Sequence, residues 1–329
     1  MSLRTRQIVG LACLLLLAAA MCLLRVLITR VDGGISLAWP EAGIAGFRLT
    51  ALSVGAIVGC SLAVSGVLLQ ALLRNPLAEP FILGISSGAG LGVMAAMYLA
   101  YRLHGPGAGG EERLAPAIIG ALITLAAVYA LGQRRGWLDP VSLVLVGVIV
   151  SAICGAGIMF FQHLVDTGLR GQFTTWLMGY IPEAVDVWVL RLCAIIALIG
   201  LVVGGVMGRA MDAATLGDDE ARSVGLSIGP LRVAMFGLAG VLAASTVALA
   251  GPIGFVGLIA PHLARLVLGP KHAALVVGAA LCGIAITVGA DVARQAVDVG
   301  AGRMPIGIFT AIIGGPAFIW LLLSGRGQS

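Results

Sequence analysis

Ten long apolar stretches constrain this chain more than any other feature of its sequence. A helix needs about 20 mostly apolar residues to cross a hydrocarbon core roughly 30 Å thick. With 60% hydrophobic and 11% charged residues, the 329-residue chain has the composition of a polytopic membrane protein. We therefore predict an all-α bundle forming a single transmembrane domain over residues 1–329. The expected spans lie near residues 8–28, 49–70, 81–101, 115–132, 141–163, 188–208, 232–250, 255–268, 273–291 and 306–324.

The basic residues near the two ends predict the orientation of this bundle. The first stretch follows Arg4 and Arg6, as a signal peptide would, but it is longer than a usual signal core and precedes further spans. We interpret it as the first helix. Ten spans place both termini on one side, and Arg4, Arg6 and Arg326 favour the cytoplasm under the positive-inside rule.

The segment Gly251–Arg265 is apolar but contains several helix-breaking residues. It reads GPIGFVGLIAPHLAR, with three glycines and two prolines. Because proline removes a backbone donor and glycine weakens a helix, an uninterrupted helix is not expected here. Broken backbone is tolerated at membrane depth only where other protein shields it from lipid. We therefore expect this segment inside the bundle.

Residues 209–232 form a polar loop between the sixth and seventh expected helices. Asp218, Asp219 and Glu220 favour the start of a short helix, and Gly225 and Gly229 are candidate stops. Two interpretations of this helix stay open from the residues alone. It is either a solvated cap over the bundle or a surface on which a partner docks.

Several kinds of chemistry are not indicated by the sequence. The single lysine, Lys271, does not stand in a glycine-rich P-loop, so any energy from ATP must come from another subunit. Acidic residues fall at or near the ends of the expected helices, which argues against an ion-coupled carrier, although that alternative is kept. The sequence lacks the serine elbow that would indicate an intramembrane hydrolase. Its cysteines are scattered and indicate no metal site, and its arginines are scattered and indicate no nucleic-acid binding.

Three long motifs resemble the FecCD-type permeases, the membrane subunits of ABC importers for iron chelates (siderophores), haem and vitamin B12. They are GVLLQALLRNPLAEPFILGISSGAG at residues 66–90, the segment at 251–265, and MPIGIFTAIIGGPAFIWLLL at 304–323. The resemblance implies a type II ABC importer permease in the bacterial inner membrane, with a second permease copy in a homodimer. It also implies two ATP-binding subunits that hold ATP and Mg and a periplasmic substrate-binding protein; this chain itself would hold no cofactor.

The same resemblance assigns roles to particular residues. Residues 209–232 become the cytoplasmic coupling loop, which the ATPases grip at Leu216, Gly217, Glu220, Ala221 and Gly225. The outward-facing arginines that pair with the binding protein correspond to Arg48 and Arg294. The cytoplasmic gate corresponds to Asn75, Leu77, Pro140 and Val141.

Helix placement alone suggests which residues line a pathway for the chelate. The candidates are Met159, Phe160, Gln162 and Arg170, although packing is an alternative role for the first three and lipid anchoring for the arginine. Two departures from the family concern docking. The family's second arginine after Arg48 is missing from Arg48-Leu49-Thr50-Ala51, and Arg303 replaces an acidic residue.

Overall fold

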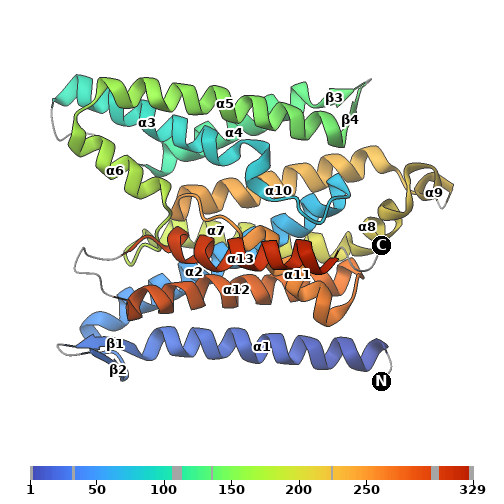
Figure 1. Ribbon diagram of the computed structural model, residues 1–329, viewed down its shortest axis with the longest axis horizontal. Coiled ribbons are helices and arrows are strands. Elements are labelled where there is room, and N and C mark those ends of the chain that lie inside the picture. The colour runs from blue at the N-terminus through green and yellow to red at the C-terminus, as the bar shows by residue number, and fades with distance from the viewer. Residues whose placement is uncertain are drawn as a thin grey trace.

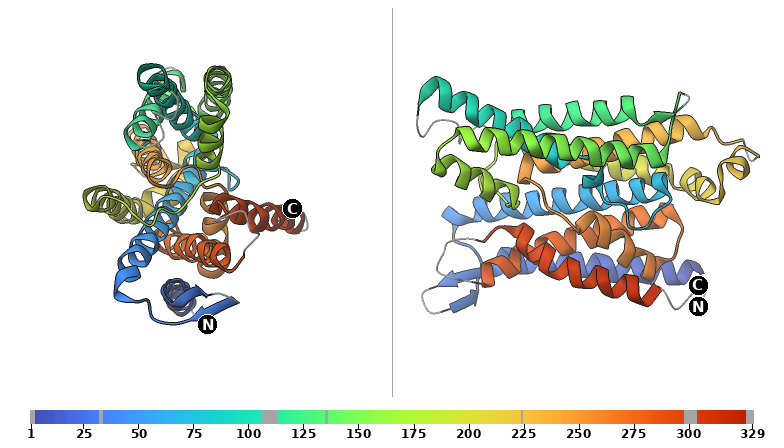
Figure 2. Two further views of the ribbon diagram at one scale, coloured as in Figure 1. Left: turned by 90° about the vertical axis from the view of Figure 1, so that its left-hand side faces the viewer. Right: turned by 45° about the horizontal axis from the view of Figure 1, so that its top comes forward.

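The computed structural model describes residues 3–31, 34–105, 113–134, 136–223, 225–297 and 304–325. Its long helices run side by side along one axis, as the end-on view in Figure 2 shows. Arg303, the departure noted above, lies outside the described residues. The long helices are α1 (Leu3–Leu27), α2 (Ala42–Leu73), α3 (Ile85–His104), α4 (Leu114–Leu131), α5 (Pro140–Leu164), α7 (Val187–Val206), α10 (Ile228–Ala250), α12 (His272–Ala296) and α13 (Ile306–Gly325).

Each of the ten expected spans corresponds to a helix, and the eighth of them, 255–268, is the short α11 (Val256–Leu268). Within the described ranges, seven helices are long and apolar enough to cross a membrane by length and composition. The helices omitted by that criterion are α3, α11 and α13. The prediction of an all-α membrane bundle is therefore confirmed, with boundaries that differ by a few residues.

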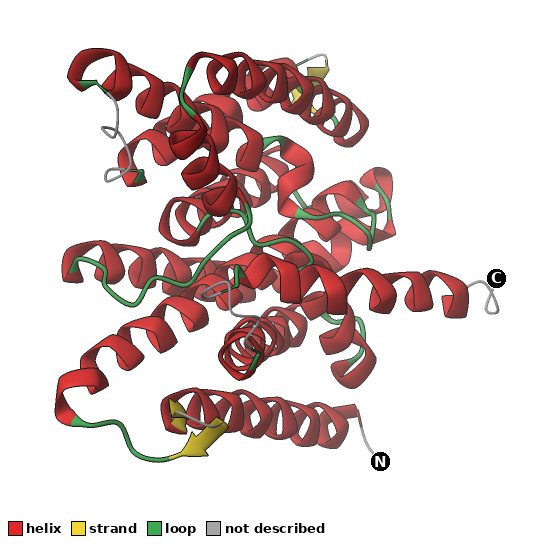
Figure 3. Ribbon diagram, turned by 60° about the vertical axis from the view of Figure 1, so that its left-hand side comes forward, coloured by secondary structure: helices red, strands yellow, loops and turns green. Residues whose placement is uncertain are grey.

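Short helices and hairpins lie at the two ends of the bundle (Figure 1). At one end lie α6 (Thr167–Leu177) and the hairpin of β1 (Ile28–Val31) and β2 (Gly34–Leu37), which Figure 3 shows beside the end of α1. We call this the β1–β2 end. The other, which we call the α9 end, carries α8 (Gly208–Leu216), α9 (Asp218–Ser223) and the hairpin of β3 (Gln133–Arg134) and β4 (Trp137–Leu138). Both chain termini lie toward the α9 end (Figure 1).

Helix α2 runs through the centre of the bundle and is its most deeply buried span. It packs against α12, α10 and α11, and glycines allow the closest of these crossings. A Cβ atom built on Gly59 would overlap the backbone of Gly283 on α12, and one built on Gly66 would overlap Gly257 on α11. Because lipid tails compete for ordinary apolar contacts, this close fit of small residues holds the membrane helices together.

The glycine- and proline-rich segment is broken where it begins and helical where it ends. Residues 251–255 are not helical, whereas α11 continues through Pro261, so this proline does not end the helix. A short helix, η1 (Pro80–Leu83), lies beside the break, and Glu79 accepts a 2.6 Å hydrogen bond from the Phe255 amide. The carboxylate replaces a backbone partner that the broken helix lacks.

The outer surface of the bundle is apolar over most of its length. Exposed side chains include Leu16 at 70%, Ile149 at 58% and Val206 at 79% exposure, on three different helices. Trp39 and Trp188 are exposed near the β1–β2 end, and Trp137 is exposed at the α9 end. An apolar band with tryptophans near both edges is the pattern expected where a protein meets the two interfaces of a bilayer.

Candidate functional site

The loop at residues 209–232 folds into two short helices at the α9 end of the bundle. The predicted short helix is confirmed as α9, with Ala221 fully buried and Glu220 exposed. Gly217 separates it from α8 with a φ of 143°, a backbone conformation that favours glycine, and the side chain of Glu220 lies against this glycine. The loop is therefore a compact helical hairpin with an exposed polar face.

Glycine and leucine positions define the edges of this hairpin. Gly225 follows α9 with a φ of 82°, and its amide donates a 2.9 Å hydrogen bond to the Arg222 carbonyl, as expected for a helix stop. The expectation that Gly229 is another stop is wrong, because α10 begins at Ile228 and includes it. Leu216 ends α8 and is 74% exposed, so it is accessible to a partner.

Asp218 ties this hairpin to the core of the bundle. Its carboxylate accepts 3.0 Å hydrogen bonds on both oxygens from Arg232 of α10, and Arg74, at the end of α2, forms an ion pair with the same carboxylate. Arg74 also donates a 3.0 Å hydrogen bond to the Ala214 carbonyl of α8. One acidic side chain thus joins α9 to the ends of two long helices, and we call this set the Asp218 clamp.

A separate contact joins α8 to α12. Asp212 accepts a 2.9 Å hydrogen bond from the His272 amide at the start of α12, and its carboxylate lies 2.7 Å from His272 Nδ1. The imidazole is buried, whereas the carboxylate is 39% exposed. Movement of α8 would therefore be transmitted to α12 as well as to α2 and α10.

The four predicted gate residues lie at this same end. Asn75 and Leu77 directly follow Arg74, and the Asn75 side chain accepts a 3.0 Å hydrogen bond from the Leu77 amide. Pro140 and Val141 form the first turn of α5, where Val141 is 67% exposed. The structure therefore places both segments beside the hairpin of α8 and α9, while their role as a gate, like the coupling role of the hairpin, stays a prediction.

Asp139 fixes the start of α5 next to these gate residues. It accepts 2.8 Å hydrogen bonds from the backbone amide and the hydroxyl of Ser142. These bonds, the backbone one first, lower the pKa of Asp139. The Leu138 carbonyl accepts a 3.2 Å hydrogen bond from Arg232, so the start of α5 is also connected to the Asp218 clamp.

The two arginines predicted to face a binding protein have different environments. Arg48 is partly buried near the start of α2 and donates 2.7 Å and 2.8 Å hydrogen bonds to the Val26 carbonyl and the Thr29 hydroxyl. Arg294 is only 6% exposed and donates a 2.8 Å hydrogen bond to Asp291. The expectation that Arg294 follows the ninth helix is wrong, because α12 extends to Ala296 and packs this side chain inward; its docking role stays a prediction.

The four predicted pathway residues also have different environments. Met159 and Phe160 are 72% and 60% exposed on α5, and Gln162 is partly buried. Arg170, on α6, donates hydrogen bonds of 3.1 Å and 2.9 Å to the Val165 carbonyl at the end of α5. A cation at this position complements the carboxyl end of a helix, so its visible role is to cap α5.

The ion pairs of the Asp218 clamp were not predicted from the sequence. Arg74 and Asp218 stand 144 positions apart, and no local pattern joins them. Asp291 and Arg294 did carry a signal, because residues three apart lie on the same face of a helix. The signal was missed because the ninth span was expected to end at position 291, which placed Arg294 outside the helix.

Comparison with known proteins agrees with this architecture. The model of the FecCD transport family matches residues 17–324. The hemin transport system permease protein HmuU of Yersinia pestis is 35% identical over 282 residues, covering 85% of this chain and 83% of that protein. The vitamin B12 import system permease protein BtuC of Vibrio cholerae is 37% identical over 279 residues, covering 84% and 81%.

A solved structure described as a metal-chelate type ABC transporter in an inward-facing conformation has the same fold. It superposes with a TM-score of 0.83 at 29% identity and covers 96% of this chain and 99% of its own. Both the family match and the sequence relatives extend over most of the chain. The chain is a multi-pass membrane permease and belongs to the FecCD transport family.

Proposed function

We propose that this chain is the permease subunit of an ATP-driven, binding-protein-dependent importer that moves a metal chelate into the cytoplasm by alternating access. Separate ATP-binding subunits, which would hold ATP and Mg, dock on α8 and α9. The α9 end then faces the cytoplasm, and both termini lie on that side. A second copy of the chain completes the pathway, and a periplasmic binding protein delivers cargo at the β1–β2 end with Arg48 among its contacts.

The observation that carries this proposal is the position of the Asp218 clamp between the coupling hairpin and both gate segments. Arg74 binds Asp218 and directly precedes Asn75, while Arg232 binds Asp218 and the Leu138 carbonyl, two residues before Pro140. A force applied to α9 therefore reaches both segments through one carboxylate. ATP shifts the equilibrium between the two states only by the difference in its affinity for them.

The cargo is a large planar or macrocyclic chelate, in line with the haem and vitamin B12 named for the relatives. The exposed apolar face of α5, including Met159 and Phe160, would face the second copy and line the route. Thioether and aromatic groups offer contact area without a charged binding group. Such a surface allows a chelate to pass without being held.

Uptake in proteoliposomes tests this function. The chain is purified with its ATP-binding subunits and binding protein, and entry of haem, cobalamin or a ferric siderophore is measured with and without internal ATP. We expect ATP-dependent uptake of one cargo, abolished by Glu220→Ala and unchanged by Asp219→Ala. Asp219 is the matched control, because it is 96% exposed on the same short helix.

The ion-coupled secondary carrier makes the opposite prediction in the same vesicles. It would accumulate cargo with a proton or sodium gradient and no ATP, and an ionophore would stop it. Asp291, the acidic residue deepest within a long helix of the described chain, is paired with two arginines, Arg25 and Arg294. This carboxylate is engaged in a buried structural ion cluster, so the importer is the function that we favour.

A further inference from the structure

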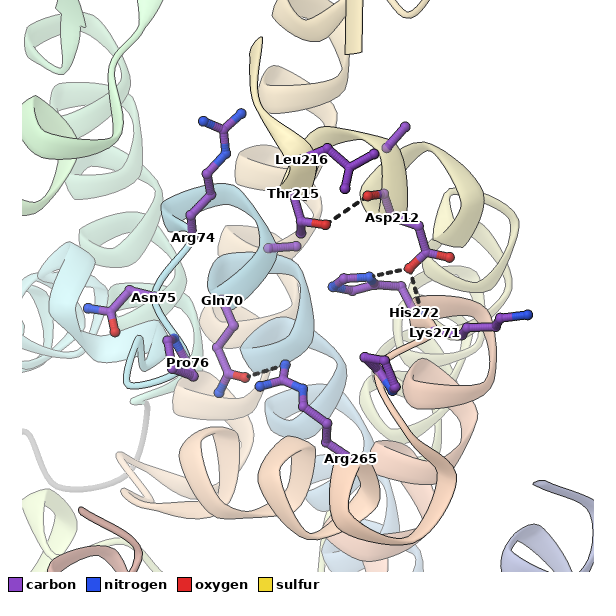
Figure 4. Close-up of a pocket in the computed structure, with 13 residues that line it drawn as sticks. Gln70, Arg74, Asn75, Pro76, Asp212, Thr215, Leu216, Arg265, Lys271 and His272 are labelled. Atoms are coloured by element: carbon purple, nitrogen blue, oxygen red, sulfur yellow. Dashed lines mark hydrogen bonds and ion pairs between the residues drawn. The ribbon is translucent and has the colours of Figure 1, made fainter. Parts of the chain in front are cut away.

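A cavity at the α9 end is lined by several hydrogen-bond donors and borders the predicted gate segment at Asn75 and the end of α8 at Leu216. It measures about 680 Å³ and is bounded by the end of α2, by α8 and by the turn between α11 and α12 (Figure 4). Three cationic residues line it, Arg74, Arg265 and Lys271, against the single carboxylate of Asp212. We call it the Arg265 cavity.

One residue that lines the cavity has a hydrogen-bond donor without a partner. Gln70 is 3% exposed, and its side-chain carbonyl accepts a 3.3 Å hydrogen bond from Arg265 Nη2. The amide nitrogen of Gln70 has no hydrogen-bond partner among the described residues. A buried donor without a partner is unfavourable, so this amide favours a ligand that supplies an acceptor.

The only acidic group of the cavity is already engaged. Asp212 accepts from the His272 amide and lies 2.7 Å from His272 Nδ1, and Figure 4 shows these two side chains turned toward each other. Arg265, in contrast, uses one of its five N–H donors in the hydrogen bond to Gln70. The cavity therefore offers a free positive charge and free donors, with no free carboxylate to hold a cation.

We propose that the Arg265 cavity binds the phosphate group of a small ligand, with Arg265 and Gln70 as its principal donors. Donors that converge from different elements suit a tetrahedral oxyanion with several acceptor oxygens, and arginine recognises phosphate through paired N–H groups. The volume exceeds that of free phosphate, which leaves room for a further group on the phosphate. Two sources share this chemistry: the headgroup of an anionic phospholipid and a soluble phosphate ester.

Binding here would join three elements that move relative to one another in the proposed cycle. The ligand would contact α2 through Gln70, α11 through Arg265 and the end of α8 through the cavity wall at Thr215. This regulatory consequence depends on the proposed importer function. The binding itself does not, so it is measured on the permease alone.

Two assays on the purified chain in a neutral detergent separate the sources. Native mass spectrometry with equimolar phosphatidylglycerol and phosphatidylcholine reports retained lipid, and isothermal titration with glycerol 3-phosphate reports a soluble ester. We expect saturable binding of one probe at about one per chain. The Arg265→Gln variant should lose tenfold or more in affinity, whereas Arg265→Lys should lose less because it keeps the charge.

A second variant, Gln70→Glu, tests the proposal even if Arg265→Gln fails to fold. It gives Arg265 an internal carboxylate as partner, so the side chain remains paired while the phosphate site is blocked, and binding should disappear. The control is Arg102→Gln, an exposed arginine near the far end of α3. The proposal is overturned if neither probe binds wild-type protein saturably, or if Arg102→Gln and Arg265→Gln change the affinity equally.

Discussion

The buried ion cluster at the β1–β2 end makes a strong prediction about stability. Asp291 of α12 lies between Arg25 of α1 and Arg294 of its own helix, and the three side chains are 2%, 1% and 5% exposed. Arg294 Nη2 lies 2.7 Å from the carboxylate, and Glu183 approaches Arg25 at 3.7 Å. The cluster adds a buried ionic contact between α12 and α1, a helix at the edge of the bundle that also packs on α12.

We expect Asp291→Asn to destabilise the protein by about 3–5 kcal/mol, because it leaves two buried arginines with a single carboxylate, that of Glu183, 3.7 Å from Arg25. Asparagine has nearly the same shape as aspartate, so no cavity contributes to this value. At about 2.1 cal/mol/K of unfolding entropy per residue, the midpoint of this 329-residue chain shifts by about 1.4 °C per kcal/mol, so thermal unfolding should occur roughly 4–7 °C lower.

Thermal unfolding in detergent, followed with a thiol-reactive fluorophore, measures this shift. Four cysteines, at positions 60, 154, 193 and 282, are buried and become reactive only on unfolding. Asp219→Asn is the control, because its 4.0 Å contact with Arg222 is exposed, and no resolvable shift is expected. An unshifted midpoint for Asp291→Asn would refute the reasoning, since it would mean that water solvates these arginines.

Helix contacts, the Asp218 clamp and the cap of α5 each yield a measurable expectation. Gly66→Leu should prevent recovery of monodisperse protein, whereas Gly46→Leu on the same helix, which faces open space, should purify normally. Asp218→Asn should preserve the unfolding midpoint within a few degrees but reduce cargo-stimulated ATP turnover about fivefold or more, as loss of coupling requires. Asp139→Ala should cost about 1 kcal/mol. Because hydrogen bonds from Ser142 lower the folded pKa of Asp139 below 3.8, that difference in stability should be constant at neutral pH and disappear only as pH falls through the lowered pKa.

Hydropathy predicted the spans because each one must satisfy its backbone internally, and this constraint acts within a single stretch of sequence. The hairpin of β1 and β2 was not predicted, although Asp32-Gly33-Gly34 is a turn signal between two short runs that contain β-branched residues. Helix α8 was also missed, because nine mixed residues carry little periodic signal. The family motifs indicated the coupling loop, but only the structure brought Arg74 and Arg232 to Asp218.

The two ion clusters differ in a way that suits their positions. The Asp291 cluster is almost fully buried, so separating its charges is costly and α1 stays fixed to α12. The Asp218 clamp is 33% exposed at its carboxylate and 37% at Arg74, so water and salt weaken it. This weaker kind of contact suits the proposed transport cycle, in which the clamp would rearrange. Raising ionic strength should therefore reduce coupling at the α9 end before it affects unfolding, and equal sensitivity of ATP turnover and unfolding to salt would contradict this division.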